Sequence, residues 1–197
     1  MINNLLELLK EVRPLSAQAT ERLSSIFNIH NKPKGTQLLK EGEISEHLFF
    51  VVKGLARACY YEKEVQITSW MVAENEFIYS PASFILQKPS IETIELLENT
   101  TYLSISKKDL ENTYQAYPET AYVSLKINQK YILLFEERAK LLRLSADERY
   151  ARFEIQYPYL KGRLKMEHLA TYLGLSRSSI QSIKNKDYFL NKITGEL

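Results

Sequence analysis

The spacing of apolar residues divides the chain into regions of different texture. In residues 1–27, apolar side chains recur at helical spacing, and Ser16 is placed to cap a second helix. Residues 28–105 instead contain short runs rich in β-branched and aromatic residues, separated by turn signals. These runs are HLFFVVKG, LARACYYE, VQITSWMV, IETIELLE and TTYLSI. They predict an antiparallel barrel or sandwich, with Gly35, Gly42 and Gly54 at tight turns.

Helical periodicity returns after Ser106, which is placed to cap the next helix. Pro118 then begins a long helix that is expected to reach about Leu144. One apolar row on it alternates spacings of three and four, as a coiled-coil seam requires. This row is Leu125, Asn128, Ile132, Phe135, Ala139 and Leu142.

A second row on the same helix consists of Val123, Ile127, Leu134 and Leu141. It is expected to pack on the barrel. A helix that is apolar on two sides needs two partners, so we expect a homodimer; burial of the helix within one monomer is the alternative.

The segment LATYLGLSRSSIQSI, residues 169–183, predicts a helix-turn-helix. Before it, Ser145 and Glu148 form a capping box that opens another helix. The first helix of the motif is expected at 165–172 and the second from 176 to about 184. Ala170 supplies a small residue at the crossing and Gly174 a residue that tolerates positive φ, while Ile180 and Ile183 anchor the second helix.

The outward face of this second helix is polar, which favours contact with DNA. Small hydroxyl residues allow a helix end to enter the major groove, and Arg177 can bind the O6 and N7 atoms of guanine. Lysines would hold phosphates without reading sequence. The predicted DNA-binding residues are Lys165, Ser176, Arg177, Ser178, Ser179, Gln181, Ser182, Lys184 and Lys186.

Charge and composition agree with this interpretation. The 197 residues are 45% hydrophobic and 25% charged, typical of a globular protein, and no apolar run approaches the ~20 residues needed to cross a bilayer. The N-terminus does not read as a secretion signal, so we expect a cytoplasmic protein without membrane partners. From residue 161 onward the net charge is +4, against −2 for residues 1–160, which suits contact with a polyanion.

Metal, redox and enzymatic functions find little support in the sequence. Cys59, the single cysteine, lies in a strand-like run that suggests a buried thiol, with a redox sensor as the alternative. His30, His47 and His168 show no ligand spacing, so no metal, haem or other cofactor is expected. A cupin-like enzyme would need an H-x-H pair, and phosphate-loop and hydrolase motifs are absent. The more serious alternative is a protein-interaction module whose helix-turn-helix does not bind DNA.

The order of these elements resembles the Crp/Fnr (catabolite-activator-like) family of bacterial transcription regulators. KGTQLLKEGEISEHLFFVVKGLARACY is similar to its β-roll, and LGLSRSSIQSIKNK to its recognition turn and helix. The resemblance implies an α+β chain: a β-roll of the cyclic-nucleotide-binding, jelly-roll type with N-terminal helices (1–117), a dimerisation helix (118–144) and a winged-helix-type helix-turn-helix domain (145–197).

The resemblance also implies a non-enzymatic homodimer on a two-fold operator in double-stranded DNA, with RNA polymerase as a further candidate partner. Arg177 falls where the family commonly places a guanine-reading arginine. Ser178 and Ser182 stand where acidic and second basic readers are often found, so the operator preference is expected to differ from that of the best-known member.

The sensor region departs from the cyclic-nucleotide pattern. The stretch ENEFIYSPASFILQKPSIETIELL has no glycine and no arginine, and Glu92 would repel a phosphate. Leu134 and Phe135 are apolar where a purine would need hydroxyls. We therefore expect no response to cyclic AMP. The roll interior is expected to be lined by Arg57, Trp70, Tyr79, Ser80 and Ser83, either as a pocket for an unidentified small-molecule effector or as a filled core.

Overall fold

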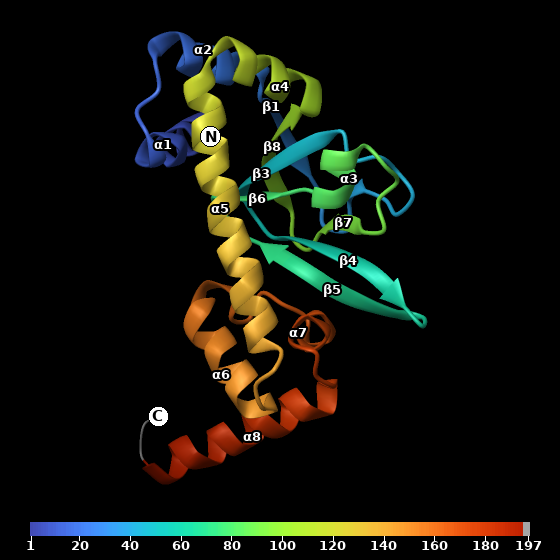
Figure 1. Cartoon of the computed structure of the whole chain (residues 1–197). Coiled ribbons are helices and arrows are strands. Elements are labelled where there is room, and N and C mark those ends of the chain that lie inside the picture. Colours follow the sequence, from blue (N-terminus) through green and yellow to red (C-terminus); the bar gives the residue numbers. More distant parts are fainter. Residues whose placement is uncertain (195–197) are drawn as a thin grey trace.

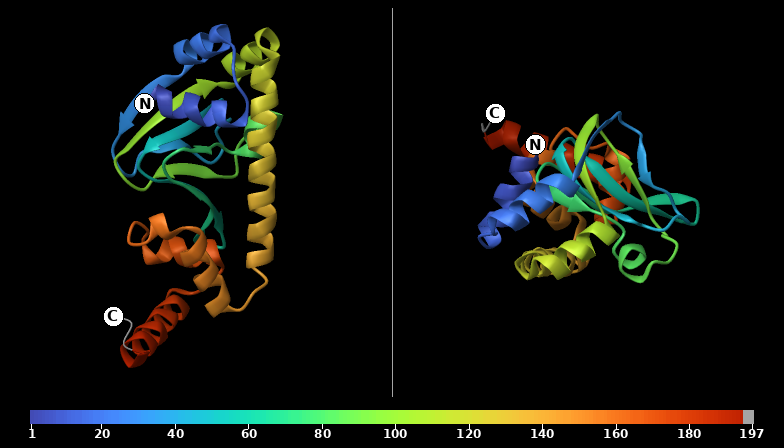
Figure 2. Two further views of the ribbon diagram at one scale, coloured as in Figure 1. Left: turned by 90° about the vertical axis from the view of Figure 1, so that its left-hand side faces the viewer. Right: turned by 90° about the horizontal axis from the view of Figure 1, so that it is seen from above.

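One long helix organises the molecule. The computed structural model describes the backbone of residues 1–194 and the side chains of residues 1–186. The helix is α5 (Pro118–Leu141), slightly shorter than predicted. The β-roll and the N-terminal helices pack along its first half, and α6, α7 and α8 gather at its C-terminal end (Figures 1 and 2).

The roll consists of two antiparallel four-stranded sheets in the described part of the chain, with strand orders β1-β8-β3-β6 and β2-β7-β4-β5. The strands are β1 (Asn28–Lys32), β2 (Gln37–Leu39), β3 (His47–Lys53), β4 (Ala56–Glu62), β5 (Val65–Val72), β6 (Glu76–Ile78), β7 (Thr93–Leu96) and β8 (Thr100–Ser106). All five runs predicted as strands form strands, namely β3, β4, β5, β7 and β8. The shorter β1, β2 and β6 are not predicted by the pattern.

The remaining helices are α1 (Ile2–Val12), α2 (Ala17–Ile26), α3 (Pro81–Leu86), α4 (Lys107–Ala116), α6 (Ala146–Gln156), a 3₁₀ turn (Pro158–Leu160), α7 (Met166–Leu173) and α8 (Arg177–Thr194). The predicted caps are confirmed. Ser16 accepts a hydrogen bond from the N–H of Ala19, and Ser106 accepts one from Asp109. Ser145 and Glu148 form the full capping box at the start of α6.

Two apolar cores lie on opposite sides of the sheet β1-β8-β3-β6. Inside the roll, Phe49, Val51 and Trp70 pack between the sheets. On the outer face, Phe50 and Leu103 are fully buried beneath α1, α2 and α5. Alternate residues of β3 thus serve different cores, because successive side chains of a strand point to opposite faces.

The predicted glycine turns are confirmed, since Gly35, Gly42 and Gly54 all have positive φ. Gly54 is the most constrained of the three. A Cβ atom there would lie 2.4 Å from Oγ1 of Thr100, in addition to the strain of its φ of +112°. The turn from β3 to β4 therefore requires glycine.

The C-terminal helices are tied to the roll by Arg163. Its guanidinium binds the carboxylates of Glu74 at 2.9 Å and Glu98 at 2.8 Å, and it donates to the carbonyl of Gly54 at 3.1 Å. Burial opposes ionisation of Glu74, but the hydrogen bonds from Arg163 and the Gly54 N–H lower the pKa of this carboxyl to about 2. Arg163 therefore binds residues in three different turns of the roll, at Gly54, Glu74 and Glu98.

A second contact joins α7 to β5. Oγ1 of Thr171 accepts from the N–H of Thr68 at 3.2 Å and donates to its hydroxyl at 3.1 Å. Arg138 of α5 donates to the carbonyls of Thr68 and Tyr172, and its guanidinium lies 4.5 Å from the Tyr172 ring centroid. The position of α7 is thus set by the roll and by α5 together.

The described residues after α5 form helices and contain no β-strand. The wing implied by the winged-helix expectation is therefore not among residues 142–194. No described helix is long and apolar enough to span a membrane.

The Arg163 cluster generates a stability prediction. Arg163→Ala leaves two carboxylates without their partner and should lower the free energy of unfolding by about 2–3 kcal/mol, measured by urea denaturation. Lys161→Ala is the control, because Lys161 is 76% exposed and its ion pair with Glu154 should contribute less than about 1 kcal/mol. Equal effects of the two substitutions would contradict the role assigned to Arg163.

Candidate nucleic-acid interface

The turn between α7 and α8 is built on Gly174. Its φ of +63° and ψ of 37° place it in the left-handed region. The N–H of Leu175 donates to the carbonyl of Ala170 and the N–H of Gly174 to that of Thr171, which together form a Schellman motif. The predicted break at Gly174 is confirmed, and its reason is the conformation that ends α7.

Two arginines satisfy the carbonyls that this turn leaves free. Arg149 of α6 donates to Leu173 at 3.0 Å and to Gly174 at 3.1 Å, and Arg138 donates to Tyr172 at 2.9 Å. A Cβ at position 174 would lie 3.2 Å from Nη1 of Arg149. The turn is therefore held from outside as well as by its own backbone.

The inward side of the motif is apolar and closed. Ala170, Leu173, Ile180 and Ile183 are all buried, and they pack in one cluster with Tyr150 and Phe153 of α6. The assignment of Ile180 and Ile183 as the anchors of the second helix is confirmed. That helix, α8, runs to Thr194 and is longer than predicted.

The outward side of the motif is polar and open. Eight of the nine predicted DNA-binding residues are exposed and Ser179 is half-buried. Ser176 to Lys186 form one continuous stretch, whereas Lys165 precedes α7. The exposed members are Lys165, Ser176, Arg177, Ser178, Gln181, Ser182, Lys184 and Lys186. Asn185, exposed on the same helix, was not predicted and accepts a hydrogen bond from Gln181 at 3.0 Å.

Some side chains on this surface are held in place by hydrogen bonds within the chain, and others are not. Ser176 caps α8 by accepting from the N–H of Ser179 at 3.0 Å, and its hydroxyl also bonds those of Ser178 and Ser179. By contrast, the side chains of Arg177 and Ser182 have no partner among the described residues. Arg177 lies at the first turn of α8, where the unpaired N–H groups and the helix dipole favour a nearby anion.

Among the residues whose side chains are described, the lysines have only weak partners. Lys165 lies 3.5 Å from Glu167, and Lys186 lies 3.7 Å from Asp147, with all four side chains exposed. Nζ of Lys184 is 5.8 Å from the Tyr150 ring centroid. Because exposed ion pairs contribute little, a phosphate can replace these carboxylates at small cost.

The predicted seam on α5 is largely an exposed apolar stripe. Ile132 is 64% exposed, Leu125 54% and Phe135 43%. Ala139 is also exposed. The second row packs inward as expected, with Val123 and Leu141 buried and Ile127 and Leu134 partly buried.

Asn128 and Leu142 are the seam residues least available to a partner, whereas Phe135 remains 43% exposed although it packs against Trp70. Asn128 accepts from the Tyr79 hydroxyl at 3.0 Å and donates to the Ser124 carbonyl at 2.9 Å, so its amide is engaged within the monomer. Leu142 is half-buried beyond the end of α5, and its Cδ2 would lie 3.5 Å from a Cβ at Gly174. The stripe therefore centres on Leu125, Ile132 and Phe135.

The predicted effector pocket is not one site in the structure. Arg57 lies on the opposite face of β4 from Ala58, which packs with Trp70 inside the roll. It is held by Glu95 at 2.6 Å, by Thr68 at 3.0 Å and by Gln66. The expectation that Arg57 lines the roll interior is wrong, because residue type alone does not give the face of a strand, whereas Trp70 and Tyr79 do line it.

The two serines of that prediction serve the loop around α3. The Ser80 oxygen accepts from the Ser90 hydroxyl at 3.0 Å. Ser83 accepts from the N–H of Ser45 at 2.9 Å and donates to the Lys88 carbonyl at 2.5 Å. Both are buried, and both have structural partners.

The roll interior is nearly filled. It keeps a cavity of about 60 Å³, lined by Trp70, Tyr79 and Phe135 among others, with Glu92 the one acid or base in its lining. The Trp70 and Phe135 rings lie 4.4 Å apart, and Glu92 accepts from the Ser69 hydroxyl at 2.5 Å. A purine nucleotide has no room there, and the carboxylate opposes a phosphate.

The thiol and the histidines have structural environments. Cys59 is buried, and burial raises its pKa to about 11, which makes it a poor nucleophile. His30 bonds Ser104 at 2.9 Å and stacks on Tyr102. Within the described residues no group of three His, Cys, Asp or Glu side chains is arranged to hold a metal.

The chain is similar to known proteins in one domain of its sequence and in its fold. Residues 29–117 match the family of the cyclic nucleotide-binding domain. FixK2 from Bradyrhizobium japonicum is 16% identical, with 84% of this chain and 86% of that chain covered and a TM-score of 0.74. A transcriptional regulator of the Crp/Fnr family from Eubacterium rectale is 19% identical, with 90% and 85% covered and a TM-score of 0.68.

The chain has the Crp/Fnr fold. The catabolite activator protein of Thermus thermophilus is also similar, with 18% identity, 88% of this chain and 84% of that chain covered and a TM-score of 0.55. A search of curated proteins finds no match. Within the Crp/Fnr fold, α7 and α8 form the helix-turn-helix and α5 is the long connecting helix.

His168 generates a pH prediction. It is buried on α7, and burial, together with the charge of Arg57, lowers its pKa to about 4. Between pH 6.5 and 4, His168 is protonated in the unfolded chain but neutral in the folded chain. The free energy of unfolding should therefore decrease as the pH falls through this range. The loss between pH 7.5 and 5 should be about 2 kcal/mol.

Urea denaturation at the two pH values measures this loss. His168→Gln should remove most of it, whereas His30→Gln should remove less, because His30 is partly exposed to water, although burial lowers its pKa as well. An unchanged pH dependence in His168→Gln would show that this ring does not control it.

Proposed function

We propose that the protein is a sequence-specific, double-stranded DNA-binding transcription regulator that acts as a homodimer. The observation that carries this proposal is the asymmetry of α8. Ile180 and Ile183 are buried, while Arg177, Gln181 and Ser182 on the opposite side are exposed. A helix that only filled a core would not need an exposed polar face. This face also belongs to the segment from residue 161 onward, which has a net charge of +4.

The contacts support a division of roles along the surface. Arg177 has no partner among the described side chains and lies in the first turn of α8, where its fork can bind a guanine edge. Lys165 precedes α7 and is suited to a backbone phosphate, which would position the domain without reading sequence. The serine cluster at Ser176 offers hydroxyls and helix N–H groups to a second phosphate.

The exposed stripe on α5 supports dimerisation. Leu125, Ile132 and Phe135 would be buried by the same stripe of a second chain, as the isologous contact of a two-fold dimer requires. Such a dimer on DNA would place its two α8 helices about 34 Å apart, one turn of the duplex.

The proposal excludes cyclic AMP as the effector. Three features support this: the small volume of the roll interior, the Glu92 carboxylate on its wall and the packing of Phe135 against Trp70. In addition, α3 begins with Pro81, which has no N–H to offer a phosphate.

Base reading can be tested by exchanging single side chains. Arg177→Ala should flatten the preference at one base position in each half-site, a loss of about 1–3 kcal/mol of discrimination in selection from random DNA. Lys165→Ala should weaken all sequences alike and reduce the slope of log K against log salt by about one. Equal effects of the two variants on the selected sequence would contradict the division of roles.

The same measurements separate the proposal from the alternative of a protein-interaction module. Fluorescence anisotropy with a random duplex at several salt concentrations should show binding that weakens steeply as salt rises. The absence of binding at low salt would favour the interaction module.

Dimerisation can be tested on the stripe. Ile132→Asp should give monomers by light scattering and weak operator binding, because it would place two carboxylates in a dry seam. Ile155→Asp on α6 is the matched control, since Ile155 is 80% exposed and lies outside the stripe. An intact dimer in Ile132→Asp would refute the assignment of α5 as the interface.

A further inference from the structure

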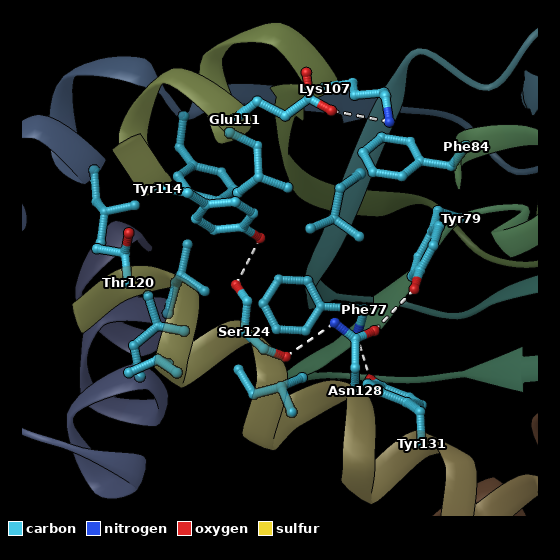
Figure 3. Close-up of a pocket in the computed structure, with 18 of the residues that line it drawn as sticks. Phe77, Tyr79, Phe84, Lys107, Glu111, Tyr114, Thr120, Ser124, Asn128 and Tyr131 are labelled. Carbon is cyan, nitrogen blue, oxygen red and sulfur yellow. Dashed lines mark hydrogen bonds and ion pairs between the residues drawn. The ribbon is translucent and has the colours of Figure 1, made fainter. Parts of the chain in front are cut away.

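A second and larger cavity lies outside the roll interior. It has a volume of about 280 Å³, is partly open to solvent, and is bordered by α1, α2, α3, α4 and α5 over the outer face of the sheet that contains β3 and β6 (Figure 3). Phe77, Tyr79 and Tyr131 line both this cavity and the small interior one, so they form the wall between them.

The wall of this outer cavity is mainly apolar. Its apolar side chains come from seven helices and strands and from the segments that join them, and several belong to the core beneath α1 and α2. They include Leu5, Leu9, Leu48, Phe84, Leu110 and Ile127. A ligand enclosed by such a wall gains its binding energy from the burial of its own apolar surface.

The polar groups of the cavity are already paired with one another. The Tyr114 hydroxyl donates to Oγ of Ser124 at 2.7 Å, and that of Tyr79 donates to Asn128 at 3.0 Å. The Tyr131 hydroxyl accepts from the N–H of Phe77 at 2.8 Å (Figure 3). A ligand rich in polar groups would therefore have to break bonds in the wall, which disfavours it.

Charge at the cavity is balanced. Nζ of Lys107 lies 3.0 Å from Glu111 and 5.4 Å from the centroid of the Phe84 ring, and these are the two ionised side chains of the lining (Figure 3). An anionic ligand would have to displace Glu111 from Lys107. The site thus favours a neutral molecule.

We propose that this cavity binds a small, neutral, predominantly apolar molecule. Apolar cavities of about 150 Å³ are known to take up benzene, so a volume of 280 Å³ that is also open on one side suits a ligand with about two or three aromatic rings or a medium-length alkyl chain. One polar atom can be accommodated, because Ser124 accepts from Tyr114 and keeps its own proton to donate. The inference goes beyond DNA recognition and does not depend on it.

The site is well placed to affect the rest of the molecule. Val123, Ser124, Ile127 and Tyr131 line the cavity from α5, and the opposite side of the same helix turns carries Leu125 and Ile132 of the stripe. Asn128 lies on α5 between the cavity and the stripe, and its side chain accepts a hydrogen bond from Tyr79 in the cavity wall. A ligand that shifts the packing of α5 would therefore also act on the stripe.

The test uses N-phenyl-1-naphthylamine, a neutral fluorescent probe with apolar rings, on the full chain. Its fluorescence should rise in a saturable manner with one site per chain. The anionic analogue 1-anilinonaphthalene-8-sulfonate should bind about tenfold more weakly. The absence of saturable binding, or tighter binding of the sulfonate, would overturn the proposal.

A pair of variants on α4 places the probe. Leu110→Trp fills the cavity and should weaken probe binding by about tenfold or more, whereas Gln115→Trp adds the same ring at an exposed position of the same helix and should leave it unchanged. Equal binding by the two variants and the unmodified chain would place the probe elsewhere and refute the site.

A second pair of variants tests the same site if the Leu110→Trp protein does not fold. Leu110→Ala enlarges the cavity and should change the Kd of the probe by about threefold or more, with Gln115→Ala as its control. Identical Kd values in this pair would also refute the site. DNA binding, measured separately on the same proteins, shows whether the fold and the proposed function are intact.

Discussion

The whole structure depends on a single helix that has apolar residues on two sides. One side of α5 is satisfied within the chain, where Val123 and Leu141 are buried against the roll and the C-terminal helices. The other side, with Ile132 and Leu125, is not satisfied by the described residues of one chain. Because exposing such a stripe to water is unfavourable, the same helix that supports the monomer also favours association.

The connection from this helix to the recognition surface consists of arginines. Arg138 extends from α5 to α7, Arg149 extends from α6 to the turn at Gly174, and Arg163 grips the turns of the roll. Each binds two or more backbone carbonyls or carboxylates through the planar, five-donor guanidinium, whose donors point in fixed directions. The apolar anchors give the helix-turn-helix its shape, and these polar contacts give it a fixed orientation.

Features determined by local chemistry could be predicted from the sequence. Ser16, Ser106 and Ser145 act as caps because the bond they form is with a backbone group three residues away. Gly174 and the anchors Ile180 and Ile183 follow from one helical period. Features that depend on distant pairing could not be predicted in the same way. Arg57 faces away from Trp70 because of the strand register, and Leu142 contacts the C-terminal domain because α5 ends at Leu141.

The outer cavity shows the same limit. Its lining is assembled from residues as distant as Leu9, Phe84 and Ile127, and the sequence gives no reason for a space to remain between them. A partial signal was present, because Ser124 and Asn128 interrupt an apolar side of α5 one turn apart. Their meaning depends on Tyr114 and Tyr79, which reach them from other elements.

The shared guanidinium of Arg138 has a consequence for motion. One Nη2 atom bonds the carbonyl of Thr68 on β5 and that of Tyr172 on α7, while the side chain itself starts from α5. A swivel of α7 away from the roll would stretch the bond to Tyr172, whereas the bond to Thr68 joins α5 to β5 and would persist. Arg138 would therefore keep one buried partner while α7 moves, which lowers the energetic cost of releasing the C-terminal helices from the roll.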